Sequence, residues 1–272
     1  MNHAISTWVY QDCPVEQAVE LLAGSRFSAV ELSGTGSALM TAWQNDGPGT
    51  TALLGRHGIA IASVHCSRTG RAHLGSSNRH ARNGAVQENI AFLRNMAGCG
   101  IRQLVLHPEG VEKITSGPES LGGAAGDDQY LREALSCLAD CAGALGVNLA
   151  VENMQAASSP FASVRNLLAA IAGLGDHVGL CHDVGHSLLA GLDPGREMAL
   201  ALASGRLLSL HLHHVRGDGT DHLLLEDGNP DLQALLTRLD KACFSGQCTI
   251  ELRPAAAVAP GDVLLAAAKM FL

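Results

Sequence analysis

Eight short apolar runs recur along the chain, and segments with the spacing of amphipathic helices lie between them. Helical periodicity is clearest at residues 15–23, 85–98 and 130–146. Strands that alternate with helices predict a parallel sheet covered by helices. We expect the strands at residues 4–9, 29–33, 61–66, 103–108, 148–153, 178–183, 207–213 and 248–252. Eight strand–helix units in this order predict an α/β fold of the (β/α)8 type, a TIM barrel.

Polar and apolar residues alternate within the later strands. In the seventh run Leu208, Leu210 and Leu212 share one parity, and Ser209 and His211 share the other. Because successive side chains of a strand point to opposite faces, we expect the leucines to face the outer helices and the polar residues to line the interior. Such inward series end at the carboxyl ends of the strands, where barrel active sites lie.

The length of the chain agrees with this fold. A TIM barrel takes about 250 residues, and the chain has 272 residues and a mass of 28.2 kDa. We therefore expect one domain over residues 1–272. An open doubly wound sheet is the alternative, but no glycine-rich phosphate-binding fingerprint follows the first run.

Composition and charge narrow the classes of partner. The formal net charge is −8, which disfavours binding to a nucleic-acid backbone. No apolar run approaches the roughly 18 residues of a membrane span, and the N-terminus lacks the pattern of a signal peptide. We therefore expect a cytoplasmic protein. Eight cysteines without paired CxxC spacing predict reduced, mostly buried thiols.

Four polar residues at or near strand ends form the main candidate site. Three carboxylates and one imidazole suit a divalent ion such as Mn²⁺, Zn²⁺, Co²⁺ or Mg²⁺. Acids crowded at one barrel mouth repel one another unless a cation compensates them. Separate salt bridges are the alternative, but the strands supply no basic partners. The predicted metal ligands are Glu152, Asp183, His211 and Glu251.

Further histidines end other strands. His65 and His107 follow from the third and fourth strands, and they could bind a second ion shared through Glu152 or hydrogen-bond a substrate. His186 and His222 form a weaker third group with the same two alternatives. A histidine at a strand end is also often only a satisfied polar residue.

Two other residues have roles that the sequence leaves open. Glu31 ends the second strand, and it either orients a ligand or pairs with an arginine. His213 shares the inward parity of His211, and we expect it at most behind the ligands.

Two long connections and the last segment complete the prediction. Residues 67–84 carry several arginines and histidines, and residues 108–129 are rich in glycine, serine and acids. Loops of this length in a compact domain are often functional, so we expect both to cover the site. Residues 263–272 are expected to form the last outer helix or to contribute to a homo-oligomer contact.

Five motifs resemble those of the xylose isomerase-like TIM barrels. That superfamily contains sugar isomerases and epimerases, inosose dehydratases, hydroxypyruvate isomerases and the endonuclease IV type of DNA-repair enzyme. The resemblance covers nearly the whole chain. The motifs are Val30-Glu31-Leu32, Val105-Leu106-His107-Pro108, Val151-Glu152-Asn153, Asp183-Val184-Gly185-His186, and His211 followed eleven residues later by His222.

The resemblance implies roles for these positions. The four predicted ligands match the shared metal ligands of the superfamily, and His65, His107, His186 and His222 match positions that endonuclease IV fills with further zinc ions. One motif departs from the pattern. The usual Asp-x-His reads Thr220-Asp221-His222, so its acid is displaced by one position, which argues against a third ion. The later Gly-x-Gly is reduced to residues 228–230.

The leading functional hypothesis is a metal-dependent isomerase or epimerase of a small sugar or sugar phosphate. A metal ion would stabilise the enediolate formed when a carbon acid loses its proton. Glu152 and Glu251 could remove and return that proton on opposite faces. His107 and His186 would hold hydroxyl groups, and arginines within residues 68–82 would meet a phosphate.

Two other functions remain as alternatives. An endonuclease IV-like enzyme that cleaves DNA at abasic sites would use two or three ions, but the net charge and the few aromatic residues argue against it. A barrel that binds sugar or metal without turnover is the second alternative. An incomplete ligand set would favour it, whereas the set in this sequence is complete.

Overall fold

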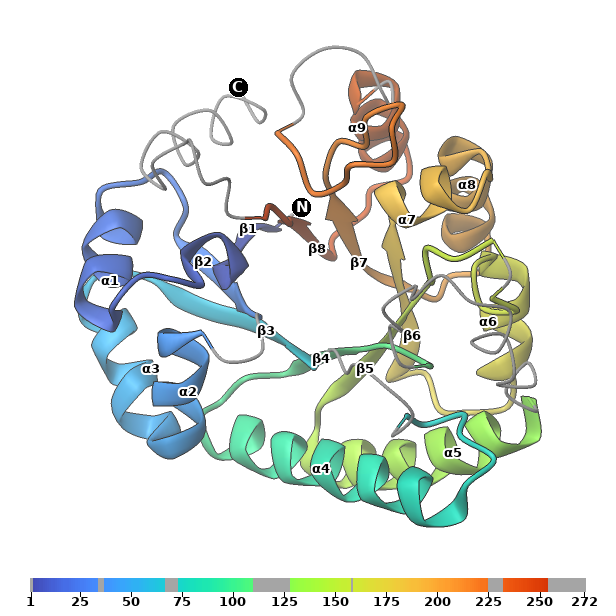
Figure 1. Ribbon diagram of the computed structural model, residues 1–272, viewed down its shortest axis with the longest axis horizontal. Coiled ribbons are helices and arrows are strands. Elements are labelled where there is room, and N and C mark those ends of the chain that lie inside the picture. The colour runs from blue at the N-terminus through green and yellow to red at the C-terminus, as the bar shows by residue number, and fades with distance from the viewer. Residues whose placement is uncertain are drawn as a thin grey trace.

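The eight strands close into one parallel barrel in which neighbours follow the order of the sequence and β8 pairs with β1 (Figure 1). The computed structural model describes residues 2–33, 37–66, 73–109, 128–157, 159–224 and 232–253. The predicted TIM barrel is therefore confirmed. The strands are β1 (Asn2–Ser6), β2 (Ala29–Leu32), β3 (Ala60–Cys66), β4 (Gln103–Leu106), β5 (Asn148–Glu152), β6 (Val178–Asp183), β7 (Leu207–Leu212) and β8 (Gln247–Ile250).

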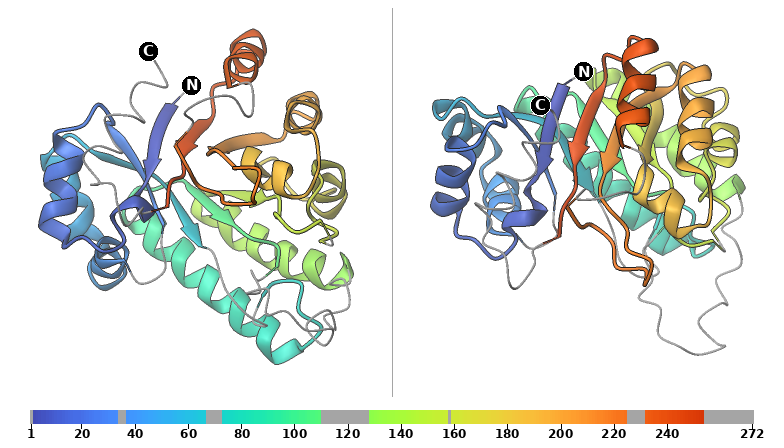
Figure 2. Two further views of the ribbon diagram at one scale, coloured as in Figure 1. Left: turned by 45° about the horizontal axis from the view of Figure 1, so that its top comes forward. Right: turned by 90° about the horizontal axis from the view of Figure 1, so that it is seen from above.

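Helices pack around the outside of this barrel (Figure 2). Several begin at a side-chain cap, as in α8, where the Asp193 carboxylate accepts from the Arg196 N–H and Pro194 occupies the first turn. The helices are α1 (Val15–Ala23), α2 (Ala38–Asn45), α3 (Gly47–Arg56), α4 (Arg79–Gly98), α5 (Asp128–Leu145), α6 (Val164–Ala170), α7 (Val184–Leu189), α8 (Pro194–Ala203) and α9 (Leu232–Lys241). Among the described residues, no helix combines the length and apolar character needed to cross a membrane.

The barrel interior has an apolar part and a polar part. Leu149 and Leu180 face outward and are fully buried in the main core beneath the helices. Val105, Ala150 and Cys181 form a separate small cluster inside the barrel. Each lies two residues before a polar residue on the same chain segment. The inner cluster therefore fills the barrel below the polar side chains at its carboxyl end.

The first strand is shorter than predicted. β1 covers Asn2–Ser6, and the expected continuation to residue 9 is instead a 3-10 helix, η1 (Thr7–Tyr10). The Ser6 hydroxyl accepts a hydrogen bond from the Trp8 N–H and so caps that turn. Aromatic and β-branched residues in this run favour a strand, but the serine cap outweighs that preference.

One leucine breaks the predicted alternation. β6 and β7 pair Leu180 with Leu207 and Cys181 with Ser209, so Leu208 is an extra residue at a bulge. Leu208 packs against the inner cluster and not outward as expected. The bulge resets the alternation, and the residues after it keep the predicted faces.

The two long connections lie partly outside the described residues, namely at 67–72 and 110–127. The expected last helix at 263–272 lies wholly outside them. The part at 79–84 was predicted to be loop, and it is the first turns of α4. The Asn78 side chain caps this helix by accepting from the N–H groups of His80 and Ala81. The Arg82 guanidinium donates to the Ser76 carbonyl and lies over the Tyr130 ring. These contacts anchor Arg82 at the start of α4.

Candidate metal centre

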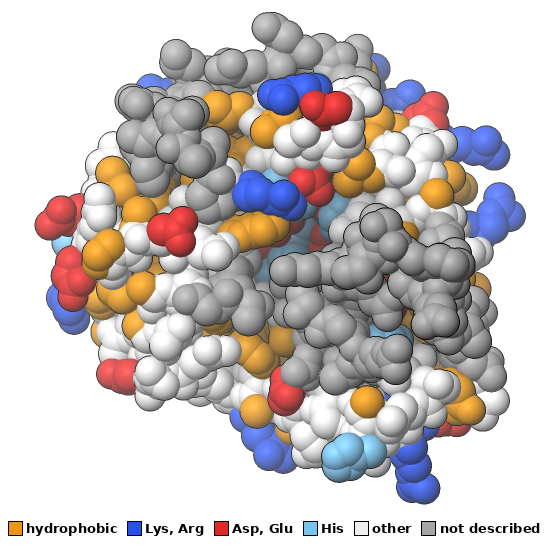
Figure 3. Space-filling model, viewed as in Figure 1, with side chains coloured by type: hydrophobic (Ala, Val, Ile, Leu, Met, Phe, Trp, Pro, Cys, Tyr) orange, Lys and Arg blue, Asp and Glu red, His pale blue; other side chains and the backbone are white. Residues whose placement is uncertain are grey.

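The polar side chains at the carboxyl ends of seven strands, β2 to β8, converge inside the barrel mouth. The space-filling view shows histidine and acidic side chains at the bottom of a hollow in the centre of this face (Figure 3). Each of these side chains belongs to one of the last two residues of its strand or to the residue directly after it, and each is buried. They are Glu31, His65, His107, Glu152, Asp183, His211 and Glu251.

The four predicted metal ligands lie together. Each of Glu152, Asp183, His211 and Glu251 offers one donor atom, and these atoms are all within 4.8 Å of one another. His211 Nδ1 is 3.2 Å from Glu152 Oε1, 2.9 Å from Glu251 Oε2 and 3.8 Å from Asp183 Oδ2. Three carboxylates from β5, β6 and the end of β8 thus surround one ring nitrogen.

A buried acid faces the other side of the His211 ring. His211 Nε2 lies 3.0 Å from Glu31 Oε1, and the second Glu31 oxygen accepts a 2.6 Å hydrogen bond from the Ser63 hydroxyl. Gln247 donates to the same hydroxyl over 2.7 Å. Of the two roles left open for Glu31, the structure places it beside a predicted ligand. A carboxylate at Nε2 favours a proton there, which leaves the Nδ1 lone pair for a cation.

The donor set has the properties that a divalent ion requires. Asp183 Oδ2 is buried and accepts no hydrogen bond, and the buried oxygens Glu152 Oε2 and Glu251 Oε2 face only imidazole nitrogens. Burial raises the pKa of Glu152 and Glu251, but neighbouring imidazoles, His211 first, outweigh it and hold both pKa values well below the usual range. These groups are therefore anionic at neutral pH. Hard oxygens with one imidazole fit a hard or borderline cation.

A second group adjoins the first through Glu152. Its Oε2 lies 3.0 Å from His65 Nε2 and 3.1 Å from His107 Nε2, and the two ring nitrogens are 3.2 Å apart. Burial lowers the pKa of His107. For His65 the acids Glu152 and Glu251 outweigh burial and raise the pKa to about 10. The structure thus brings the second predicted group into contact with the first.

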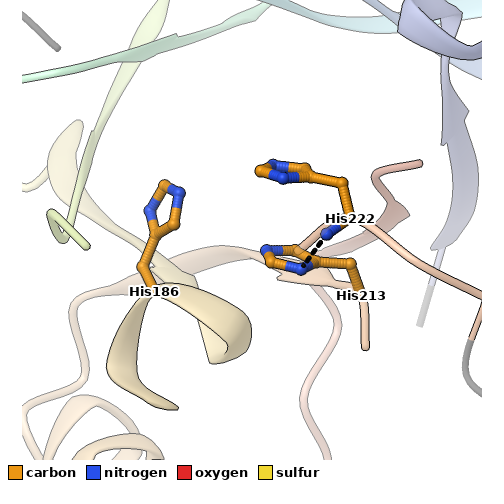
Figure 4. A group of neighbouring side chains, drawn as sticks. All are labelled: His186, His213 and His222. Atoms are coloured by element: carbon orange, nitrogen blue, oxygen red, sulfur yellow. Dashed lines mark hydrogen bonds between the residues drawn. The ribbon is translucent and has the colours of Figure 1, made fainter. Parts of the chain in front are cut away.

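The third group contains one histidine more than predicted. Donor atoms of His186, His213 and His222 also lie within 4.8 Å of one another (Figure 4). The displaced acid, Asp221, contacts His222 through Oδ2, 3.2 Å from Nδ1, and it pairs with Arg253 over 2.9 Å. His213 was expected behind the ligands, and its Nε2 is hydrogen-bonded to Asp183 Oδ1 over 3.1 Å.

Sequence reasoning assigned no role to Asn153, although it stands next to Glu152. Its amide oxygen accepts the Asp183 N–H over 2.7 Å, and its amide nitrogen donates to the Asp183 carbonyl over 3.0 Å. This pairing fixes the backbone of β6 where it presents Asp183. The Asn153 carbonyl also accepts from His186 Nδ1 over 2.8 Å, so His186 carries its proton on Nδ1.

The rim of the hollow carries an aromatic side chain. The Trp8 ring meets His222 edge-on with centroids 4.8 Å apart, and the Arg253 guanidinium lies 5.3 Å from the Trp8 ring centre. Because Arg253 is paired with Asp221, its charge is largely compensated at this position. Only part of the 67–84 segment is described, so its predicted covering role remains a prediction.

The protein is a (β/α)8 barrel with carboxylates and imidazoles gathered at the carboxyl ends of its strands. The chain belongs to the xylose isomerase-like TIM barrel family, whose family model matches residues 19–271. The resemblance seen in the sequence is therefore confirmed at the level of the family.

Solved structures of similar fold share little sequence with this chain. A D-tagatose 3-epimerase-like protein is 19% identical with a TM-score of 0.79, and the match covers 100% of this chain and 96% of that one. The 3-keto-D-glucoside 4-epimerase YcjR from E. coli is 14% identical with a TM-score of 0.82, covering 100% and 99%. The IOLI protein, solved with a binding zinc atom, is 15% identical with a TM-score of 0.79, covering 100% and 96%.

One curated protein matches part of the sequence. The uncharacterized protein y4fM of Sinorhizobium fredii is 40% identical over 60 residues, which are 22% of this chain and 19% of that protein. The matched segment thus spans about a fifth of that relative.

Proposed function

We propose that this protein is a divalent-metal-dependent isomerase or epimerase of a small sugar or sugar phosphate. The observation that carries the proposal is the convergence of Glu152, Asp183, His211 and Glu251, whose donor atoms all lie within 4.8 Å of one another. When bound there, a divalent ion supplies positive charge that polarises a carbonyl group and favours loss of the neighbouring proton.

Glu152 and Glu251 are the proposed proton carriers. They come from β5 and the end of β8, with β6 and β7 between them in the barrel. Both are anionic, so each can accept a proton from a carbon next to a carbonyl group. Removal by one carboxylate leaves an enediolate, and return by the other completes an epimerisation. Return to the adjacent carbon, with the hydroxyl proton passing to the former carbonyl oxygen, completes an aldose–ketose isomerisation.

Polar groups above the carboxylates would orient the substrate. His107 and His186 lie on either side of Glu152, at 3.1 and 3.4 Å from its oxygens. His186 holds its proton on Nδ1 towards the Asn153 carbonyl, so its Nε2 is an acceptor for a hydroxyl hydrogen. The solved relatives named as epimerases of D-tagatose type and of a 3-keto-D-glucoside support a sugar substrate of this kind.

Exchange with solvent tests the proposal. Protein loaded with Mn²⁺, Co²⁺ or Zn²⁺ is incubated in deuterium oxide with a panel of ketoses and ketose phosphates. We expect deuterium at a carbon next to the carbonyl of at least one sugar, and we expect a chelator to abolish the exchange. Absence of exchange across the panel, with the ion demonstrably bound, would favour the non-catalytic binding barrel.

The second group favours one other candidate, a two-ion phosphodiesterase of the endonuclease IV type. His65, His107 and Glu152 Oε2 lie 3.0 to 3.2 Å apart, a spacing suited to a second ion bridged through Glu152. A bridging Glu152 is no longer available as a base, so the two functions exclude each other at this residue. Salt-sensitive binding and cleavage of an abasic duplex would support this candidate.

A further inference from the structure

His213 lies in one group with His186 and His222, and its hydrogen bonds determine whether its ring can bind a cation (Figure 4). We propose that His213 is a positioning residue that holds Asp183 so that one carboxylate oxygen faces the metal ion, and that it is not itself a cation ligand. This inference rests on the proposed function, because it assumes an ion beside Asp183.

The backbone of His222 fixes the protonation of the His213 ring. The His222 N–H lies 3.0 Å from His213 Nδ1, and a backbone N–H can only donate. Nδ1 must therefore offer its lone pair, and the neutral ring carries its hydrogen on Nε2. The His214 carbonyl is 3.5 Å from the same Nδ1, but it is an acceptor and cannot compete with the donor at shorter range. Nε2 then has no lone pair for a cation.

The Nε2 hydrogen of His213 is directed at Asp183. The Nε2–Oδ1 distance is 3.1 Å, and Oδ1 also accepts the His186 N–H over 2.6 Å. Two donors thus occupy Oδ1, while Oδ2 is buried and accepts no hydrogen bond. Oδ2 is the oxygen on the side of His211, 3.8 Å from its Nδ1. His213 therefore selects which oxygen of Asp183 binds the ion.

His222 adopts a backbone conformation that supports this arrangement. Its φ is 55°, in the left-handed region that residues other than glycine rarely occupy. Its carbonyl accepts the Arg253 N–H over 3.0 Å, and its ring stacks on His213 with centroids 4.0 Å apart and planes at 8°. These contacts hold His222 so that its N–H meets His213 Nδ1.

Gly185 leaves room for the His213 ring. A Cβ built at Gly185 would overlap three atoms of the His213 imidazole, so the ring would have to shift to make room for it. Gly185 lies inside α7, where alanine is otherwise the better helix former. Gly185→Ala should therefore displace His213 without altering any proposed ligand.

Titration of metal-free protein with Co²⁺ and with Mn²⁺ tests the proposal without an activity assay. We expect His213→Leu and Gly185→Ala each to weaken binding about 10- to 100-fold with the number of ions unchanged. His213→Gln keeps an N–H donor and should recover most of the affinity. Both changes break the same contact, the hydrogen bond from His213 to Asp183. The double variant His213→Leu/Gly185→Ala should therefore bind no more weakly than His213→Leu alone.

Matched controls are His80→Leu and Gly98→Ala. His80 is exposed, and nothing lies within 4 Å of a Cβ added at Gly98, so both should bind as the unaltered protein does. Unchanged affinity in His213→Leu would overturn the inference. So would loss of a whole ion with the remaining affinity intact, because His213 would then be a ligand. If the unaltered protein bound no ion, the proposed function itself would fail.

A spectroscopic measurement on the unaltered protein covers the case in which a variant does not fold. In ¹⁵N-labelled protein, His213 signals are assigned by their absence in His213→Gln. We expect an unprotonated Nδ1 and a protonated Nε2. A proton on Nδ1 would overturn the proposal.

Discussion

His211 Nε2 lies 3.0 Å from Glu31 Oε1, and both side chains are fully buried at the barrel mouth. The opposite nitrogen of the same ring faces Glu152, Asp183 and Glu251. An imidazole between one acid on one side and three on the other can carry its proton towards Glu31. It can then offer a lone pair to a cation shared with the three others.

Glu31→Gln should weaken divalent-ion binding about 10- to 100-fold. The glutamine oxygen can still accept from Ser63, but its amide would then point N–H groups at His211 Nε2 and favour the tautomer protonated on Nδ1. Calorimetric titration of metal-free protein measures the change. The exposed Glu20→Gln is the control, and equal affinities in the two variants would contradict this role of Glu31.

Glu152→Gln and Glu251→Gln should each reduce deuterium exchange into substrate by at least about 100-fold at saturating metal, because an amide cannot accept the proton. Far-ultraviolet circular dichroism checks that the barrel is intact, and the exposed Glu16→Gln serves as the control. Undiminished exchange in either variant would refute the mechanism with two carboxylates.

His182 should make stability depend on pH in acid. It is fully buried on β6, donates from Nε2 to the Pro194 carbonyl over 3.3 Å, and burial lowers its pKa to about 4 despite the neighbouring Asp183. The unfolded chain, with a histidine pKa of about 6.5, binds the proton first. The stabilising contribution of neutral His182 to the free energy of unfolding is therefore present above about pH 6.5, and it is lost as pH falls towards 4.

Urea unfolding between pH 4 and 7 measures this effect. His182→Gln keeps a donor for Pro194 but does not titrate, so its unfolding free energy should fall less steeply in this window than that of the unaltered protein. The exposed His57→Gln should follow the unaltered protein. Parallel curves for all three proteins would show that His182 does not contribute.

The thiols should differ in reactivity. Burial raises the pKa of Cys248 to about 12, whereas Cys137 and Cys243 are exposed. Because the thiolate is the reactive form, a thiol reagent at pH 8 should modify the two exposed residues and spare Cys248 until urea unfolds the protein. Peptide mass spectrometry identifies the modified cysteines. Modification of Cys248 in the folded protein at the rate of Cys137 and Cys243 would contradict its burial.

The sequence predicts the barrel and its four candidate ligands because both depend on local patterns. Alternation of faces along each strand and the position of each strand end suffice to place Glu152 and His211 at one mouth. Leu208 escapes this rule because a bulge depends on the register between two strands, which no single run encodes. The roles of Glu31 and His213 likewise depend on ring orientations and contacts between strands far apart in the sequence.

Anomalous diffraction from crystals grown with Mn²⁺ tests the central claim most directly. The account predicts one strong peak within about 2.0–2.6 Å of a carboxylate oxygen from each of Glu152, Asp183 and Glu251 and of His211 Nδ1. A fully loaded crystal whose peaks all lie away from these four residues, or which shows no peak at all, would contradict it.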